Sequence, residues 1–150
     1  MITCINGGED MAAYDELLRE IALLEADTYG TPWTIDMLRD MMQYDHNILF
    51  AETEDGILRG YLFANLVMEQ SELLRITVSP TYRRQGLGEY LLSSYLGELK
   101  GICTCSLLEV RDGNVPARSL YENFGYAEAH RRKNYYSHPV EDAIVYTLDI

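Results

Sequence analysis

A strand, a glycine-spaced basic turn and a helix follow one another between Thr77 and Leu92, and this order constrains the chain most. The β-branched run Ile76–Val78 stops before Pro80, and an apolar helical run starts after Gly88. At a helix start several backbone N–H groups lack partners, and the helix dipole adds partial positive charge. Glycines let the backbone approach a phosphate without a Cβ atom in between. The order therefore predicts a turn that holds a pyrophosphate.

Taken alone, the glycine pattern leaves two interpretations open. It is not a Walker loop, because no Gly-Lys-Ser/Thr follows, and it does not open the first strand–helix unit, as a dinucleotide fingerprint should. A tight strand-to-helix turn with surface arginines would show the same residues. The rest of the chain has to decide between a phosphate site and a plain turn.

Composition narrows the class of protein. The 150 residues are 47% hydrophobic, which favours one folded domain spanning residues 1–150. The net charge of −12 makes nucleic acid an unexpected partner, because phosphate binding needs a basic surface. We expect no membrane span and no signal peptide, hence a cytoplasmic protein. The three cysteines include no C-x-x-C pair, so the sequence predicts neither a disulfide framework nor a zinc site, and we expect no bound metal. The thiols should be buried or half-buried.

Hydrophobic periodicity predicts an α+β domain, with helices and strands interspersed. The expected helices cover residues 9–27, 35–44, about 89–100 and 117–124. The expected strands cover residues 48–52, 57–68, 71–78, 105–110, 126–136 and 143–148, with Gly60 as a bulge. Trp33 and the methionines that follow it fit either the core or the lining of a substrate cleft.

Two residues of the second half are candidates for acid–base chemistry. Glu109 stands in an otherwise apolar strand and could be a general base, its pKa raised by partial burial. It could instead face water or pair with Arg111. Tyr121 lies on the next predicted helix and could be a general acid, or could simply pack in the core.

Longer motifs indicate a resemblance to a known protein family. From Leu74 onward the chain resembles the GNAT N-acetyltransferase superfamily, whose coenzyme motif Q/R-x-x-G-x-G/A matches Arg83, Gly86 and Gly88. The chain is similar in more detail to the ribosomal-protein-alanine N-acetyltransferase (RimI) group. The motifs that carry this are Leu108–Arg111 with Asn114, Leu120–Glu122 with Gly125-Tyr126, Arg131–Tyr136, Glu141–Ala143 and Pro32-Trp33-Thr34.

The resemblance implies a fold, a cosubstrate and roles. It implies a mixed central sheet of about six to seven strands flanked by about four helices, and acetyl-CoA as donor. Glu109 would be the base and Tyr121, which also touches the coenzyme, the acid. The pantetheine arm would be bound by Ile76, Thr77 and Val78. The pyrophosphate would be bound by Arg83, Arg84, Gln85, Gly86, Leu87, Gly88 and Glu89. Asn114 would make a further contact with the coenzyme. Trp33, Tyr135 and Tyr136 would help bind the acceptor.

The implied acceptor is a protein N-terminus, most simply the alanine of a small-subunit ribosomal protein. A small amine or a lysine side chain is an alternative acceptor, and a non-catalytic acyl-CoA sensor is an alternative class. Three residues depart from the group's pattern, namely Arg75 in place of Asn, Glu89 after the turn, and Gly113 before Asn114. These departures concern substrate preference more than catalysis.

Overall fold

A computed structural model of the protein describes all of residues 1–150. Its helices are α1 (Asp15–Thr28), α2 (Ile35–Met41), α3 (Leu87–Leu99) and α4 (Val115–Asn123), with short 3-10 turns at Met11–Tyr14 and Pro80–Tyr82. Its strands are β1 (Ile2–Asn6), β2 (Asn47–Glu54), β3 (Ile57–Val67), β4 (Gln70–Val78), β5 (Cys105–Arg111), β6 (Ala127–Ser137) and β7 (Val140–Asp149). None of the helices has the length and apolar run needed to cross a bilayer.

One seven-stranded sheet carries the fold, in the order β1-β2-β3-β4-β5-β7-β6. All neighbouring strands are antiparallel except β4 and β5, which run in parallel. A parallel pair needs a crossover, and α3 supplies it. The predicted α+β class, mixed sheet and four helices are confirmed.

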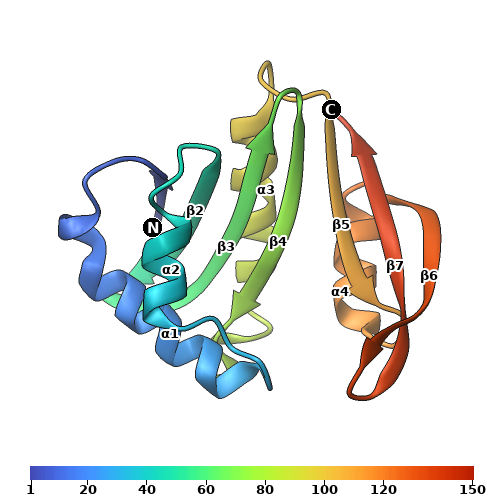
Figure 1. The fold of residues 1–150 in the computed structure, drawn as a ribbon, viewed down its shortest axis with the longest axis horizontal. Coiled ribbons are helices and arrows are strands. Elements are labelled where there is room, and N and C mark those ends of the chain that lie inside the picture. Colours follow the sequence, from blue (N-terminus) through green and yellow to red (C-terminus); the bar gives the residue numbers. More distant parts are fainter.

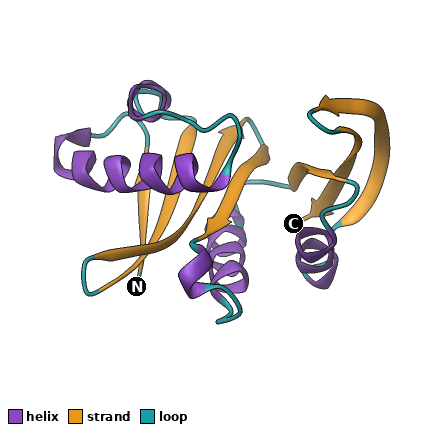
Figure 2. Ribbon diagram, turned by 90° about the horizontal axis from the view of Figure 1, so that it is seen from below, coloured by secondary structure: helices purple, strands orange, loops and turns teal.

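Helices cover the two faces of the sheet unequally (Figure 2). On one face α1 and α2 pack over β1–β3, around the fully buried Leu18, Ile21 and Tyr61. On the other face α3 and α4 pack over β2–β5 and β7. The α1–α2 face beyond β4 carries no helix, which leaves that side of β4 and β5 accessible (Figure 1).

The middle of the sheet opens between its only parallel strands. β4 and β5 pair over Gln70–Leu73 and Cys105–Leu108 and then separate (Figure 1). At the point of separation β4 has a bulge, because Arg75 lies opposite Phe63 and Leu73 opposite Ala64, which leaves Leu74 without a partner. A bulge bends its strand and increases its twist. The bulge therefore coincides with the start of the opening.

Several sequence predictions need correction. β1 was missed, because a five-residue edge strand with a mixed pattern gives little periodicity. The first helix begins at Asp15 and the second ends at Met41, and the bulge in β3 falls at Arg59, beside Gly60. Cys103 is buried and Cys105 half-buried as expected, but Cys4 is exposed, since alternation on β1 turns it away from the buried Ile5.

Candidate active site

A cavity of about 400 Å³ lies where β4 and β5 separate. Its walls come from the loop after α1, the middle of β4, the end of β5, the start of α4 and the β6–β7 hairpin. The lining residues are Tyr29, Thr31, Leu73, Leu74, Arg75, Ile76, Glu109, Val110, Arg111, Asn114, Ala117, Tyr121 and Tyr136. Five of the residues proposed from the sequence therefore meet in one place, namely Ile76, Glu109, Asn114, Tyr121 and Tyr136.

The second half of β4 offers an unpaired edge to this cavity. Its pairing with β5 ends at Leu73, while its pairing with β3 continues to Val78, so Ile76–Val78 have no partner strand on the β5 side. An extended ligand with amide groups can add to such an edge as a further strand. The edge fits the pantetheine arm expected at Ile76, Thr77 and Val78.

Beyond β4, the glycine-spaced turn is exposed. Gly86 has a φ of 78° and caps α3, and no heavy atom lies within 4 Å of the position that a Cβ would take there. Arg84 also has a positive φ, of 63°. Arg83, Arg84, Gln85, Gly86 and Glu89 are exposed, while Leu87 packs into the core. An open helix start with free backbone N–H groups is compatible with the predicted pyrophosphate site.

Glu109 reaches the cavity from β5. Its side chain is 21% exposed, and its carboxylate pairs with Arg132 of β6, with 3.2 Å between Oε1 and Nε. The sequence had offered water or Arg111 as its partner. Arg111 instead pairs with Glu141 and stacks on the ring of Tyr136, at 4.1 Å.

Tyr121 reaches the cavity from α4 and is 5% exposed. Its ring packs against Tyr126 and Tyr146, at centroid distances of 5.8 and 6.4 Å. Burial raises the pKa of the Tyr121 phenol, and the neighbouring Tyr29 adds to the rise. The phenol therefore stays protonated at neutral pH, which is the state a general acid needs. The two interpretations of Tyr121, core packing and chemistry, are compatible.

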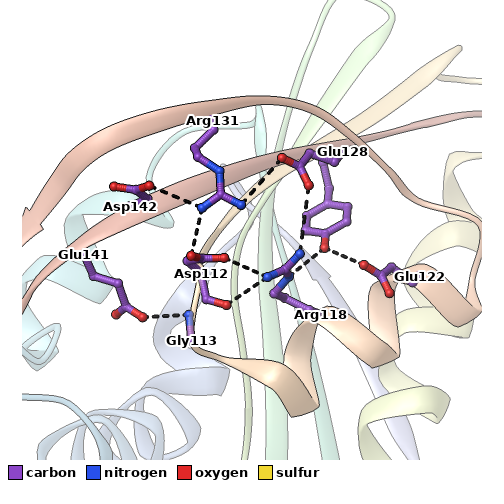
Figure 3. Close-up of polar contacts among 9 residues, drawn as sticks. Asp112, Gly113, Arg118, Glu122, Glu128, Arg131, Glu141 and Asp142 are labelled. Atoms are coloured by element: carbon purple, nitrogen blue, oxygen red, sulfur yellow. Dashed lines mark hydrogen bonds and ion pairs between the residues drawn. The ribbon is translucent and has the colours of Figure 1, made fainter.

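Asn114 stands between β5 and α4. Its Oδ1 accepts a hydrogen bond from the backbone N–H of Ala117, at 3.3 Å, and so caps α4. The segment around it is held by ion pairs, since Asp112 binds both Arg118 and Arg131 at 2.8 Å (Figure 3). This network fixes the strand exit and the start of the helix that carries Tyr121.

A polar group that sequence reasoning missed lies behind the cavity. Glu25 of α1 is fully buried. Its carboxylate pairs with Arg75 and accepts hydrogen bonds from the hydroxyl of Tyr61 and the backbone N–H of Trp33. The Arg75 guanidinium lies 4.1 Å from the ring centroid of Tyr29 and 4.2 Å from that of Trp33. A charged residue on an amphipathic helix looks like a solvated one, so nothing local marked Glu25 as buried.

The residues expected to bind the acceptor divide into two groups. Trp33 packs edge-on against Phe63, at 5.4 Å, beneath α1 and α2. It does not line the cavity, although the Arg75 guanidinium that stacks on its ring does. Tyr135 and Tyr136 both line a second cavity, of about 630 Å³, between the loop after α1 and the β6–β7 hairpin. Their placement there is compatible with the predicted role.

Comparisons with known proteins agree with this geometry. The acetyltransferase (GNAT) family matches residues 18–126, more than two thirds of the chain. The chain belongs to that family. The chain is 35% identical to the ribosomal protein bS18-alanine N-acetyltransferase of Escherichia coli strain K12, over 85% of this chain and 87% of that protein. The corresponding enzyme of Haemophilus influenzae is 33% identical over 81% and 85%.

Solved structures extend the likeness to the fold. The crystal structure of the E. coli ribosomal-protein-S18-alanine N-acetyltransferase aligns with a TM-score of 0.84 and 32% identity, over 100% of this chain and 94% of that chain. The chain is thus a GNAT N-acetyltransferase with acetyl-CoA as its donor, and the family resemblance seen in the sequence is confirmed. The roles given to single residues remain predictions.

Proposed function

We propose that this protein acetylates the N-terminal α-amine of a protein, namely the alanine that begins the small-subunit ribosomal protein bS18. Two similar enzymes that span most of the chain carry that activity in their names. The structural support is the second cavity, which shares Tyr29, Thr31, Arg111 and Tyr136 with the first. Together the two form a groove leading from the β6–β7 hairpin to Glu109, and a peptide N-terminus needs such a groove.

In this proposal Glu109 takes the first proton. A peptide α-amine has a pKa of about 8, so most of it is ammonium at pH 7 and cannot attack. Glu109, directly or through a water molecule, removes one proton, and the amine attacks the thioester carbonyl of acetyl-CoA without a covalent enzyme intermediate. The backbone N–H of Val78 polarises that carbonyl. Tyr121 gives its phenol proton to the departing thiolate.

The proposed site also binds the coenzyme. The unpaired edge of β4 at Ile76–Val78 would hold the pantetheine arm, and the turn Arg83–Glu89 the pyrophosphate. Asn114 and Tyr121 would face the coenzyme from α4. We further propose that residues 1–150 act as one catalytic domain and that the protein works in the cytoplasm, where ribosomal proteins are made.

The experiment that tests this function is incubation with acetyl-CoA and a panel of N-terminal peptides, read by mass spectrometry. The bS18 N-terminal peptide should gain one acetyl group on its α-amine. The same peptide with a blocked N-terminus and an internal lysine is the control. Acetylation of the lysine, or of small amines alone, would contradict the proposal and favour the alternative acceptors.

Glu109→Gln tests the base and separates an enzyme from an acyl-CoA sensor. The substitution should lower kcat by about 10² or more and change its pH dependence. Unchanged turnover across pH 6–9 would remove Glu109 from the mechanism. Thermal stabilisation of the wild type by acetyl-CoA with no product from any acceptor would favour the sensor.

A further inference from the structure

We propose that Glu72 is the proton acceptor for Glu109, a second carboxylate that carries the proton of the amine away from the site. The inference rests on the proposed function, because it assigns the step after Glu109 has taken that proton. No motif marked Glu72, and it does not line the cavity. Its place beside Glu109, on the side away from the cavity, is what suggests the role.

The strand geometry puts the Glu72 side chain on the uncovered face of the sheet. Its neighbours along β4, Ser71 and Leu73, are buried toward α3, where the hydroxyls of Ser71 and Tyr95 lie 2.7 Å apart. Successive side chains of a strand alternate between faces. Glu72 therefore points to the opposite face, beyond the region that α1 and α2 cover.

Glu109 points the same way from β5. Leu108 and Val110 belong to the core beneath α3 and α4, so Glu109 lies on the other face. The parallel register places Glu72 opposite Leu107, two residues before Glu109. The two carboxylates are thus diagonal neighbours on adjacent strands, on one accessible face of the sheet.

The charges around Glu72 suit a proton acceptor. Glu72 is half-buried, and its carboxylate has no ion pair or hydrogen bond of its own. Burial raises the pKa of Glu72 most, the negative charge of Glu109 from β5 raises it further, and Arg132 from β6 opposes the rise. Toward β3 the neighbour is the uncharged Asn65, whose side-chain oxygen accepts from the Glu72 backbone N–H at 3.2 Å. A carboxylate with a raised pKa holds a proton more readily than one locked in an ion pair.

Arg132 links the two carboxylates to solvent. Its guanidinium pairs with Glu109 and lowers the pKa of Glu72, and its side chain is 49% exposed. After Glu109 takes a proton, its attraction to Arg132 weakens, while Glu72 is still ionised. Transfer to Glu72, directly or through water, restores both the Glu109 carboxylate and its ion pair with Arg132.

The protons of one turnover balance in this scheme. The ammonium of the acceptor loses two protons on becoming an amide. One passes from Glu109 to Glu72 and then to bulk water. The thiolate takes a proton from Tyr121, and the second proton from nitrogen restores the phenol. Glu72 acts through Glu109 and touches neither substrate, so it is a positioning and relay residue.

The kinetic test is Glu72→Gln, which keeps the size of the side chain and removes its charge. We expect kcat at neutral pH to fall by about threefold to tenfold, with KM values unchanged. The acidic limb of the kcat/KM profile should move to lower pH, because the site loses one negative charge. Glu72→Asp should recover part of both effects.

Glu69→Gln is the control. It removes an exposed carboxylate from the β3–β4 turn and should leave kcat and the acidic limb unchanged. Wild-type kcat and an unmoved limb in Glu72→Gln would overturn the proposal, as would a change in KM alone.

A second measurement needs no acceptor. Carboxyl carbons observed by NMR during a pH titration report the pKa of Glu72 in the wild type and in Glu109→Gln. The Glu72 pKa should be above its ordinary value in the wild type and lower in the variant. Equal Glu72 pKa values in both proteins would refute the coupling. If no peptide were acetylated, the proposed function would fail, but this titration would still decide whether the two carboxylates are coupled.

Discussion

Glu141 of β7 accepts a hydrogen bond from the backbone N–H of Gly113, with 2.6 Å between nitrogen and Oε2 (Figure 3). The same carboxylate pairs with Arg111, at 3.2 Å. One side chain therefore holds the exit of β5, between the proposed base and Asn114. A Cβ on residue 113 would stand 2.5 Å from Oε2, so the carboxylate would have to move to make room for one.

Gly113→Ala should consequently destabilise the fold. The Glu141 carboxylate has to move away from the new Cβ, and the charge-assisted hydrogen bond is lost, so we expect about 1–2 kcal/mol less free energy of unfolding. Urea denaturation measures this change. Gly97→Ala is the control, because Gly97 lies exposed in α3 with no atom within 4 Å of the place that a Cβ would take, and alanine there should stabilise slightly. Equal effects of the two substitutions would contradict the role of the contact.

Arg75→Met should be more damaging than any substitution of a surface arginine. It leaves the fully buried carboxylate of Glu25 without its cation, and an uncompensated buried charge costs about 3–5 kcal/mol. The combined Glu25→Gln, Arg75→Met protein should regain much of the loss, because no buried charge remains. Unfolding free energies of the two proteins test this. The idea fails if the double substitution is no more stable than Arg75→Met.

Tyr121→Phe should impair chemistry and spare the fold. The Tyr121 hydroxyl makes no hydrogen bond within the protein, so its removal leaves no partner unsatisfied, whereas loss of a general acid should lower kcat at least about tenfold. Tyr126→Phe is the matched control in the adjoining ring. Its hydroxyl lies 2.7 Å from that of Ser106, so stability should fall by about 1 kcal/mol while kcat stays. An unaffected kcat in Tyr121→Phe would exclude it as the acid.

Arg131→Met should reduce the acid sensitivity of the fold. Hydrogen bonding to Arg131 is the main reason that the pKa of Asp112 lies below its ordinary value, and Arg131 also lowers the pKa of Asp142, where the backbone N–H of Asn134 contributes most. A carboxyl with a lowered folded-state pKa stabilises the fold above its unfolded-state value, about 3.9, and that contribution disappears as the pH falls through the folded-state value.

The measurement is the midpoint temperature of thermal unfolding, recorded at pH values from 6 down to 2.5. In the wild type the midpoint should drop steeply below about pH 4, and in Arg131→Met the drop should be shallower, since the two pKa values approach their unfolded ones. Lys100→Met removes an exposed cation from the end of α3 that has no carboxylate partner, and should keep the wild-type slope. Parallel curves for all three proteins would show that Arg131 does not protect these carboxylates.

The sequence determined most of the helices and strands and the position of the glycine-spaced turn. Period-2 and period-3.6 patterns are local, so β3, β4, α3 and β5 could be placed from their own residues. The turn at Gly86 could be found because a positive φ and a close phosphate approach both favour glycine at fixed spacing. Glu109 stood out because a carboxylate is unusual in an apolar strand, and the family motifs then supplied its expected role.

Only the tertiary structure decided how these pieces meet. The separation of β4 from β5 depends on strand pairing and on the bulge at Leu74. The hydrophobic pattern within one strand predicts neither of them. The partner of Glu109 is Arg132, 23 positions away, and the partner of Glu25 is Arg75, 50 positions away. Ion pairs of this kind depend on distances across the sheet and on burial, so the glycine-spaced turn could be recognised in the chain, but the cavity beside it could not.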